Sequence, residues 1–239
     1  MLQTRIHTLI EAVDAEIAVY YQDLGGADSL LVNPDLRMHA ASTMKVPVMI
    51  QLYQDRDDGL LSLDHRLKVR TTFASIVDGS PYELTPESDS DHTLYELVGQ
   101  EVTYHHLIDL MITVSSNLAT NILIEEVGAR RVTNLMRTLG ADSIMVLRGV
   151  EDGPAFLAGL SNTTTARDLG EIMSALGRGE AVSPEASREM VDILSRQQFR
   201  SKIPAGVPQE VRVANKTGWI TAISHDAALV FPSGAPPYT

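Results

Sequence analysis

Residues 38–49 read MHAASTMKVPVM, and this stretch carries the first of three motifs. It contains Ser42 and Lys45 in an S-x-x-K motif, at the start of an apolar run with helical spacing. Positions i and i+3 share one face of a helix, so the Lys45 amine can reach the Ser42 hydroxyl. A serine hydroxyl needs a base to act as a nucleophile, and a buried lysine of lowered pKa can be that base. The N-terminus of such a helix also offers backbone N–H groups to an oxyanion.

Two further motifs carry groups that suit the same chemistry. Residues 115–117 read Ser-Ser-Asn, in which a hydroxyl can relay a proton and an amide can hold a substrate carbonyl. Residues 216–218 read Lys-Thr-Gly, in which a cation, a hydroxyl and a residue without Cβ suit a substrate laid along a strand. Taken singly, each motif also fits a structural explanation: a capping serine with a solvated lysine, a polar helix boundary, or a strand that ends in a glycine turn.

In combination and in this order, the three motifs resemble those of the penicillin-recognising serine hydrolases. The resemblance is closest to the class A β-lactamases, whose motifs are S-x-x-K, S-D-N and K-T-G. The flanking segments LIDLMITVSSNLATNILIEEVG and ANKTG are also similar, and the resemblance extends from the first helix to Val230. Two departures stand out. Ser116 occupies the position where the family usually has Asp, and the segment before Ser115 is longer, with residues 78–81 in its insertion.

The resemblance implies how the acylation chemistry is divided among the motifs. Ser42 would be the acylated nucleophile, and Lys45 its base partner, either directly or through water. Ser115 would pass a proton to the leaving nitrogen.

The resemblance also implies a role in substrate binding for six residues: Asn117, Lys216, Thr217, Gly218, Trp219 and His225. The lysine and threonine of K-T-G would hold the substrate carboxylate, and Asn117 would hold the acylamide carbonyl. The backbone N–H groups of Ser42 and Trp219 would form the oxyanion hole. His225 stands where the class A enzymes place an arginine, and a neutral imidazole binds a carboxylate more weakly than a guanidinium does.

Hydrolysis of the acyl-enzyme needs a second base, for which the resemblance implies the loop from Arg148 to Asn162. Glu151 has the matching position in this loop, and Asn121 would brace the loop. The R-W-E-P-x-L-N signature of the family is missing around it. Glu151 is therefore either the deacylating base or a solvated loop acid, with Asp152 as its rival.

The order of patterns predicts an α+β fold of the β-lactamase/transpeptidase type. An antiparallel sheet built from both chain ends (1–40 and 200–239) would pack with a helical lobe (41–199) in a single domain. Helices are expected near residues 2–13, 43–56, 104–113, 118–127, 129–139, 165–176 and 184–195, and strands near 16–21, 29–32, 211–215 and 225–231. Residues 73–92 are expected to form a long surface loop. The last strand and the C-terminal helix of the family are expected to be missing after Thr239.

Composition excludes several other classes of function. The chain has 31 acidic and 19 basic residues and a net charge of -12, which argues against binding to nucleic acid or to an anionic membrane surface. The absence of Cys excludes disulfides, thiolate metal sites and a cysteine nucleophile. The adjacent His105 and His106 would point about 100° apart on a helix. With no H-E-x-x-H motif and no glycine-rich phosphate loop, neither a metal nor a cofactor is expected.

The leading hypothesis is thus a hydrolase that opens β-lactam amides through an acyl-enzyme on Ser42. Its partner would be a small β-lactam or a peptidoglycan-like substrate, and the protein would be a monomer without a membrane span. A D-Ala-D-Ala peptidase or an esterase would use the same motifs, and a penicillin-binding sensor would acylate without turnover. Residues 1–16 carry charges and do not resemble a signal peptide, so a periplasmic or secreted location requires that an upstream leader was removed.

Overall fold

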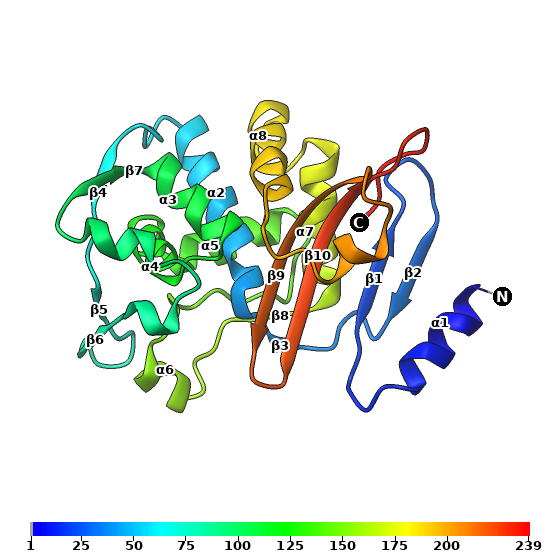
Figure 1. The fold of residues 1–239 in the computed structure, drawn as a ribbon, viewed down its shortest axis with the longest axis horizontal. Coiled ribbons are helices and arrows are strands. Elements are labelled where there is room, and N and C mark those ends of the chain that lie inside the picture. Colours follow the sequence, from blue (N-terminus) through cyan, green and yellow to red (C-terminus); the bar gives the residue numbers. More distant parts are fainter. Residues whose placement is uncertain (1) are drawn as a thin grey trace.

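The computed structural model describes residues 2–239, which form a helical part and a strand-rich part (Figure 1). The main helices of the helical part are α2 (Lys45–Asp57), α3 (Tyr104–Thr113), α4 (Asn117–Val127), α5 (Ala129–Thr138) and α8 (Pro184–Ser195). The strand-rich part contains two antiparallel hairpins: β1 (Val19–Gln22) with β2 (Ser29–Val32), and β9 (Arg212–Ile220) with β10 (Ile223–Phe231). The α+β class expected from the sequence is confirmed.

Helix α2 is the buried axis of the helical part. Every residue from Lys45 to Tyr53 is buried, and α3, α4, α5 and α8 all pack against this helix. A helix that is buried on all sides gains its stability from packing rather than from an exposed polar face. Near its C-terminal end, Asp55 accepts hydrogen bonds from Gln51 at 2.7 Å and from Arg131 of α5 at 2.5 and 2.8 Å. This paired carboxylate fixes α2 against α5.

The helix boundaries follow signals that are visible in the sequence. Helix α3 begins after Thr103, whose hydroxyl accepts a hydrogen bond from the backbone N–H of His106 at 3.2 Å. Helix α8 begins with Pro184 after Ser183, whose hydroxyl accepts the backbone N–H of Ala186 at 3.2 Å. Such capping serines and threonines satisfy donors that the first turn leaves free. Both helices have the bounds that the sequence predicts.

Helix α7 (Ala166–Arg178) joins the helical part to the strand-rich part. It begins with a capping box, in which the side chains of Thr165 and Asp168 each bind the other's backbone N–H. The helix packs against both β1 and β10. At its centre Gly170 lies against the ring of Tyr20 on β1, so closely that a Cβ at position 170 would come within 2.1 Å of that ring. The glycine is needed here for close approach rather than for backbone freedom.

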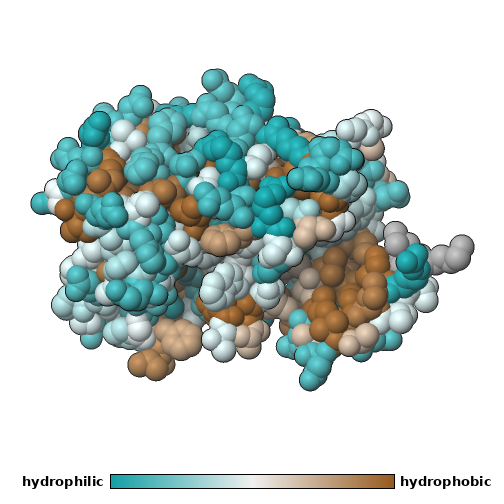
Figure 2. All heavy atoms as spheres, viewed as in Figure 1, coloured by the Kyte–Doolittle hydropathy of each residue, from teal (hydrophilic) through white to brown (hydrophobic). Residues whose placement is uncertain are grey.

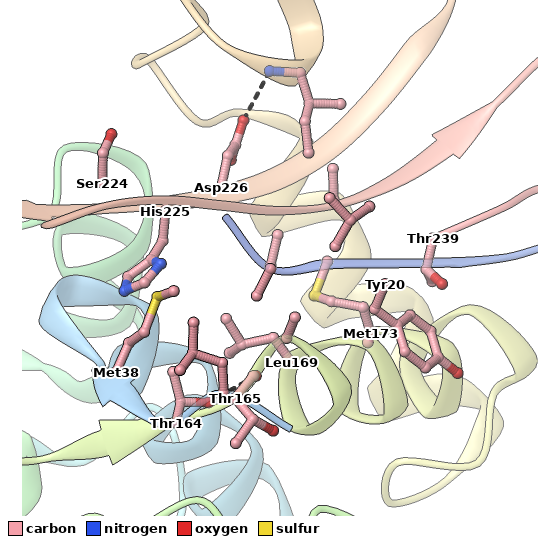
Figure 3. A pocket seen from close by; sticks show the side chains of 18 residues that line it. Tyr20, Met38, Thr164, Thr165, Leu169, Met173, Ser224, His225, Asp226 and Thr239 are labelled. Atoms are coloured by element: carbon pink, nitrogen blue, oxygen red, sulfur yellow. Dashed lines mark hydrogen bonds between the residues drawn. The ribbon is translucent and has the colours of Figure 1, made fainter. Parts of the chain in front are cut away.

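The two hairpins are linked through the last residues of the chain, not by direct pairing of β1 with β10. Tyr238 forms β-bridges to both Asp23 and Val230, and Thr239 exchanges two backbone hydrogen bonds with Gln22 at 2.9 and 3.1 Å. Strands from both chain ends therefore meet, as the sequence predicts, but they do so through this short bridging segment. Beyond the bridge, a groove of about 330 Å³ separates β1 from β10, and α7 supplies part of its lining (Figure 3).

Short elements complete the chain. The remaining helices are α1 (Leu2–Glu11) and α6 (Gly153–Leu157), and the 3₁₀ turns are η1 (Ala41–Met44), η2 (Pro86–Ser88), η3 (Thr93–Leu97) and η4 (Ile203–Gly206). The short strands pair as β3 (Met38–His39) with β8 (Thr163–Thr164), β4 (Arg66–Lys68) with β7 (Glu101–Thr103), and β5 (Thr72–Ala74) with β6 (Pro81–Glu83). None of the helices among residues 2–239 is long and apolar enough to cross a membrane.

Three details differ from the sequence expectation. The segment 73–92 is not a plain surface loop, because it carries the β5–β6 hairpin and buries the carboxylates Asp89 and Asp91. Strand β9 continues through the Lys-Thr-Gly motif, so this motif lies inside the strand instead of ending it. The expected amphipathic helix at the start of the chain forms, but Leu9 on it is 68% exposed instead of being buried. Figure 2 shows apolar surface on the neighbouring strand-rich part.

The contact between α7 and β1 leads to a prediction about stability. Replacing glycine by alanine inside a helix ordinarily stabilises it by roughly 0.5–1 kcal/mol. We expect Gly170→Ala to destabilise the protein instead, by about 1–3 kcal/mol, because the added methyl overlaps the Tyr20 ring. Urea unfolding measures the difference. Gly206→Ala is the matched control, since a Cβ there meets no atom within 4 Å. An increase in the stability of the Gly170 variant would contradict this account.

Candidate active site

Ser42 is presented by a strained turn at the start of the buried helix. Ala41, directly before it, has a backbone φ of +46°, a region that residues with a Cβ rarely adopt. The Ala41 N–H donates to Nδ1 of His39 at 2.9 Å, which holds this turn on β3. Burial, and then the positive charge of Arg148, lowers the pKa of His39, which favours the neutral imidazole that this hydrogen bond requires. Ser42 itself is half-buried at the opening of η1.

The close contact between Gly218 and the start of η1 explains why the third motif ends in glycine. A Cβ on Gly218 would lie 3.0 Å from the backbone nitrogen of Ser42 and 2.9 Å from that of Thr43. The β9 backbone can therefore approach the start of η1 only where no side chain intervenes. Trp219, the next residue on the strand, is 67% exposed at the rim of this contact. The structure thus brings the first and third motifs side by side.

The amine of Lys45 is completely buried between α2 and the turn that joins α3 to α4. Its Nζ donates to the Ser115 carbonyl at 2.7 Å and to Oδ1 of Asn117 at 2.9 Å, and it lies 3.2 Å from the Ser115 hydroxyl. Burial lowers the pKa of Lys45 to about 7, against the opposing effect of the carboxylates of Asp89 and Glu151. A substantial fraction of this amine is therefore neutral near pH 7. A neutral amine that donates both hydrogens to the two oxygens keeps its lone pair free to accept a proton.

The Ser115 hydroxyl lies between two lysines. Its Oγ is 3.2 Å from Nζ of Lys45 and accepts a hydrogen bond from Nζ of Lys216 at 3.0 Å. Ser115 has a φ of +61°, so the turn is held in a conformation that an isolated serine disfavours. Burial, followed by repulsion from Lys45, holds the pKa of Lys216 well below its ordinary value. The hydroxyl of Ser115 thus connects the second motif to both of the others.

The other residues of the second and third motifs surround this centre. Ser116 caps α4, because its hydroxyl accepts the Ala119 N–H at 3.2 Å. Asn117 donates from Nδ2 to the Ser88 carbonyl at 3.1 Å, in addition to accepting from Lys45. Thr217 is buried, and its carbonyl accepts a hydrogen bond from the Lys216 amine at 2.9 Å.

Asn121 fixes the segment before Glu151. Its amide accepts the Val150 N–H at 2.6 Å and donates to the Val150 carbonyl at 2.9 Å. Gly149 makes this approach possible, because a Cβ there would come within 2.3 Å of the Asn121 amide oxygen. Asn121 therefore holds the backbone of Val150, the residue directly before Glu151. Glu151, which follows, has a φ of +61° and an exposed side chain.

The loop that carries Glu151 is closed at its neck by polar side chains. Asn162 accepts the backbone N–H groups of Leu147 and Arg148 at 2.8 and 3.2 Å, and donates to the Arg148 carbonyl at 2.9 Å. The buried guanidinium of Arg148 donates across the loop to the Leu160 carbonyl at 2.8 Å. The loop is compact, with its ends held together, although residues 148–162 lack the family signature.

Glu151 and Asp152 have different surroundings. Asp152 is buried at 1% exposure, caps α6 through the Ala155 N–H at 3.0 Å, and accepts from the Ser75 hydroxyl at 2.8 Å and the Ile76 N–H at 3.0 Å. The Glu151 side chain is exposed, and its carboxylate is not held by a hydrogen bond to any group of residues 2–239. Its charge nevertheless acts on Lys45, whose pKa it raises. Of the two acids, Glu151 is the one electrostatically coupled to Lys45. Asp152 is held by its hydrogen bonds to Ser75, Ile76 and Ala155.

The side chain of His225, which was expected to bind substrate, contacts the backbone of β3 instead. Its strand neighbour is Gly218, but its Nε2 lies 2.8 Å from the His39 carbonyl on β3. Figure 3 shows the imidazole pointing toward Met38 into the groove between β10 and β1. Burial lowers its pKa, so the ring is neutral at pH 7. As placed, its Nε2 is occupied by the β3 backbone instead of being free for a substrate.

Two residues of the site were not expected from the sequence. His39 supports the turn before Ser42, and Asp89 accepts the backbone N–H groups of Asn117 and Leu118 at 2.8 Å each. Neither belongs to a motif, and Asp89 lies in the segment that was expected to be a surface loop. Within the described chain, 2–239, no three His, Asp or Glu side chains gather as ligands for a metal ion.

Comparison with known proteins identifies the family of this chain. The profile described as the β-lactamase enzyme family matches residues 1–239. A β-lactamase of Streptomyces albus G is 25% identical over 240 residues, covering 98% of this chain and 74% of that protein. The structure of a β-lactamase from Sphaerobacter thermophilus superposes with a TM-score of 0.82 at 28% identity, covering 99% of this chain and 85% of the other. The structure of PBP-A superposes with a TM-score of 0.84 at 27% identity, covering 99% and 84%. The chain therefore belongs to the β-lactamase enzyme family.

Proposed function

We propose that this protein is a serine β-lactamase of the class A type, which opens the amide of a β-lactam through an acyl-ester on Ser42. The observation that carries the proposal is the position of the buried Ser115 hydroxyl, 3.2 Å from Nζ of Lys45 and 3.0 Å from Nζ of Lys216. Through this one group, all three motifs converge beside the turn that presents Ser42. The relatives named as β-lactamases support the same reaction.

In the acylation step, Oγ of Ser42 attacks the lactam carbonyl carbon and its proton passes to the neutral amine of Lys45. The low pKa of this amine, about 7, suits a base that works near neutral pH. The C–N bond of the lactam breaks as Ser115 donates its proton to the nitrogen, and Lys45 returns a proton to Ser115. The distance of 3.2 Å between the two groups permits this transfer.

Substrate binding is proposed to use groups on both sides of the Ser42 hydroxyl. The backbone N–H groups of Ser42 and Trp219 would stabilise the oxyanion, and the contact of Gly218 with the Ser42 nitrogen favours this pairing. Lys216 and Thr217 would hold the carboxylate of the substrate, with Asn117 at the acylamide carbonyl. His225 could help only after giving up its contact with the His39 carbonyl.

For deacylation, Glu151 is proposed to take the proton of the attacking water. Its carboxylate is free of hydrogen bonds within the described chain and is close enough to influence Lys45. The braces at Val150 and at the Arg148–Asn162 neck would hold it in place. β-lactams and peptidoglycan are encountered outside the cytoplasm, so the proposal includes a periplasmic or secreted location. The enzyme is also proposed to be a monomer.

A second candidate is a penicillin-binding protein that is acylated but not turned over. The similarity to PBP-A favours it, and so does the missing sequence signature around Glu151. A point mutant of PBP-A has been solved as an acyl-enzyme complex with penicillin G. Such a protein, or a D-Ala-D-Ala peptidase, would use the same acylation groups. The two candidates differ only in the fate of the acyl-ester.

The assignment of the nucleophile predicts the behaviour of Ser42→Ala. We expect this variant to form no covalent adduct with benzylpenicillin, because the attacking oxygen is gone. Its fold should be retained, since η1 and α2 begin after Ala40 and Met44 without a side-chain cap that the variant could lose. Intact-mass spectrometry over minutes detects the adduct, and circular dichroism checks the fold. An adduct that persists in the variant would disprove the assignment.

The low pKa of Lys45 predicts the pH dependence of acylation. The amine acts as a base only when it is neutral, so the rate should rise with pH through about 7 and then level off. Stopped-flow measurement of the acylation rate constant between about pH 5 and 9 tests this prediction. Lys45→Ala should slow acylation by roughly 10²–10⁴-fold and abolish the rise. A rate that is independent of pH in the wild type would contradict the role of Lys45.

The proposed deacylating base predicts that Glu151→Gln accumulates acyl-enzyme. Acylation should proceed, because Ser42, Lys45 and Ser115 are unchanged, but the ester should persist as a stable mass increase. Glu180→Gln, an exposed acid beyond the end of α7, is the matched control and should turn over normally. Wild-type turnover in the Glu151 variant would place the base elsewhere. Accumulation of the adduct in the wild type would favour the penicillin-binding alternative.

A further inference from the structure

Asp89 is a buried carboxylate outside the three motifs that is bound to the start of α4. It lies between η2 and η3 and is 8% exposed. Its Oδ1 accepts the backbone N–H of Asn117 at 2.8 Å and that of Asp91 at 3.2 Å. Its Oδ2 accepts the N–H of Leu118 at 2.8 Å and the hydroxyl of Tyr95 at 3.1 Å. All four hydrogen bonds go to one side chain that the acylation chemistry does not use.

These contacts satisfy donors that the second motif cannot satisfy by itself. The first N–H groups of a helix have no partner within the helix, and an anion near them is favourable. Within residues 2–239, the side chain of Ser116, the neutral middle residue of the motif, accepts the N–H of Ala119 and no other backbone N–H. Asp89 accepts those of Asn117 and Leu118 and adds the negative charge that the Ser116 hydroxyl lacks. The first turn of α4 is therefore capped by two residues from separate segments.

The capped turn is the one that positions the acylation groups. Asn117 binds the carboxylate through its backbone and the Lys45 amine through its side chain, at 2.9 Å. Ser115, two residues earlier, has a φ of +61° and needs support from its surroundings to stay in that conformation. Three charged groups from different segments are electrostatically coupled to Lys45: Asp89 and Glu151 raise its pKa, and Lys216 has its own pKa lowered by the Lys45 charge.

We propose that Asp89 is a positioning residue for acylation, which supplies from a separate loop the anionic cap of α4 and so holds Ser115 and Asn117 against Lys45. The proposal rests on the proposed function of these three groups. It assigns to Asp89 the charge that an aspartate at position 116 would otherwise carry, and it explains how a neutral Ser116 is tolerated in the motif.

The first test compares the acylation rate by benzylpenicillin in Asp89→Asn, Ser116→Asp and the double variant. Asp89→Asn should acylate about 100-fold more slowly, because a misplaced group costs about this factor. Ser116→Asp should restore most of the loss in the double variant, since aspartate is a good capping residue at this position. A wild-type rate in Asp89→Asn would overturn the proposal, and so would a double variant as slow as Asp89→Asn.

A matched control separates positioning from stability. Asp91 is also buried and accepts hydrogen bonds from Thr93 and Leu94, but none from α4. Asp91→Asn should lower the melting temperature yet keep the rate and pH profile of acylation. In Asp89→Asn the rise of the rate should move to lower pH, because the carboxylate no longer raises the pKa of Lys45. Equal losses of acylation rate in Asp89→Asn and Asp91→Asn, with unchanged pH profiles, would overturn the proposal and leave Asp89 a purely structural role.

A measurement without substrate distinguishes failure of this proposal from failure of the proposed function. If the wild type forms no adduct with benzylpenicillin, the proposed function fails. The Lys45 ammonium can still be titrated by NMR in protein labelled with ¹³C-lysine, with Lys45→Met for assignment. A lower pKa of Lys45 in Asp89→Asn than in the wild type would support the positioning role. An unchanged pKa would overturn it.

Discussion

The buried amine of Lys45 and its hydrogen bonds to the turn between α3 and α4 are the constraint around which the molecule is organised. Removing an ammonium from water costs several kcal/mol, so the interior must supply partners or the amine must become neutral. Here it does both: the Ser115 carbonyl and the Asn117 side chain accept its hydrogens, and burial brings its pKa to about 7. Because the amine is on α2, this contact also ties the central helix to α4.

Strained backbone is concentrated around this amine. Among residues 2–239, the residues other than glycine with a positive φ are Asn33, Ala41, Ser115, Glu151 and Ala222. Three of the five lie at the candidate site. Ala41 directly precedes Ser42, and Ser115 and Glu151 are themselves candidate site residues. A left-handed conformation costs about 1–3 kcal/mol and persists only where neighbours fix it. The neighbours are visible in each case: His39 for Ala41, Lys45 for Ser115 and Asn121 before Glu151.

The charges of the site come from different kinds of structure. The two buried amines lie on regular elements, Lys45 on α2 and Lys216 on β9, and the charge of Lys45 helps to lower the pKa of Lys216. The carboxylates that raise the pKa of Lys45 against the effect of its burial, Asp89 and Glu151, come from irregular segments of the chain. Loops tolerate sequence change better than the elements they connect.

By itself the sequence determined the features that depend on neighbours close along the chain. Helices α3 and α8 have their predicted bounds because Thr103 and Ser183 cap them locally, and the motifs at Ser42, Ser115 and Lys216 are legible as residue types at short spacing. Only the tertiary structure decided that Asp89 binds α4, that His225 turns to the His39 carbonyl, and that Tyr238 links the two hairpins. Each of these contacts joins segments far apart in the chain, and no periodicity or capping rule encodes such a distance. Their partners are selected by the packing of the whole fold, which places donors and acceptors together after the local elements have formed.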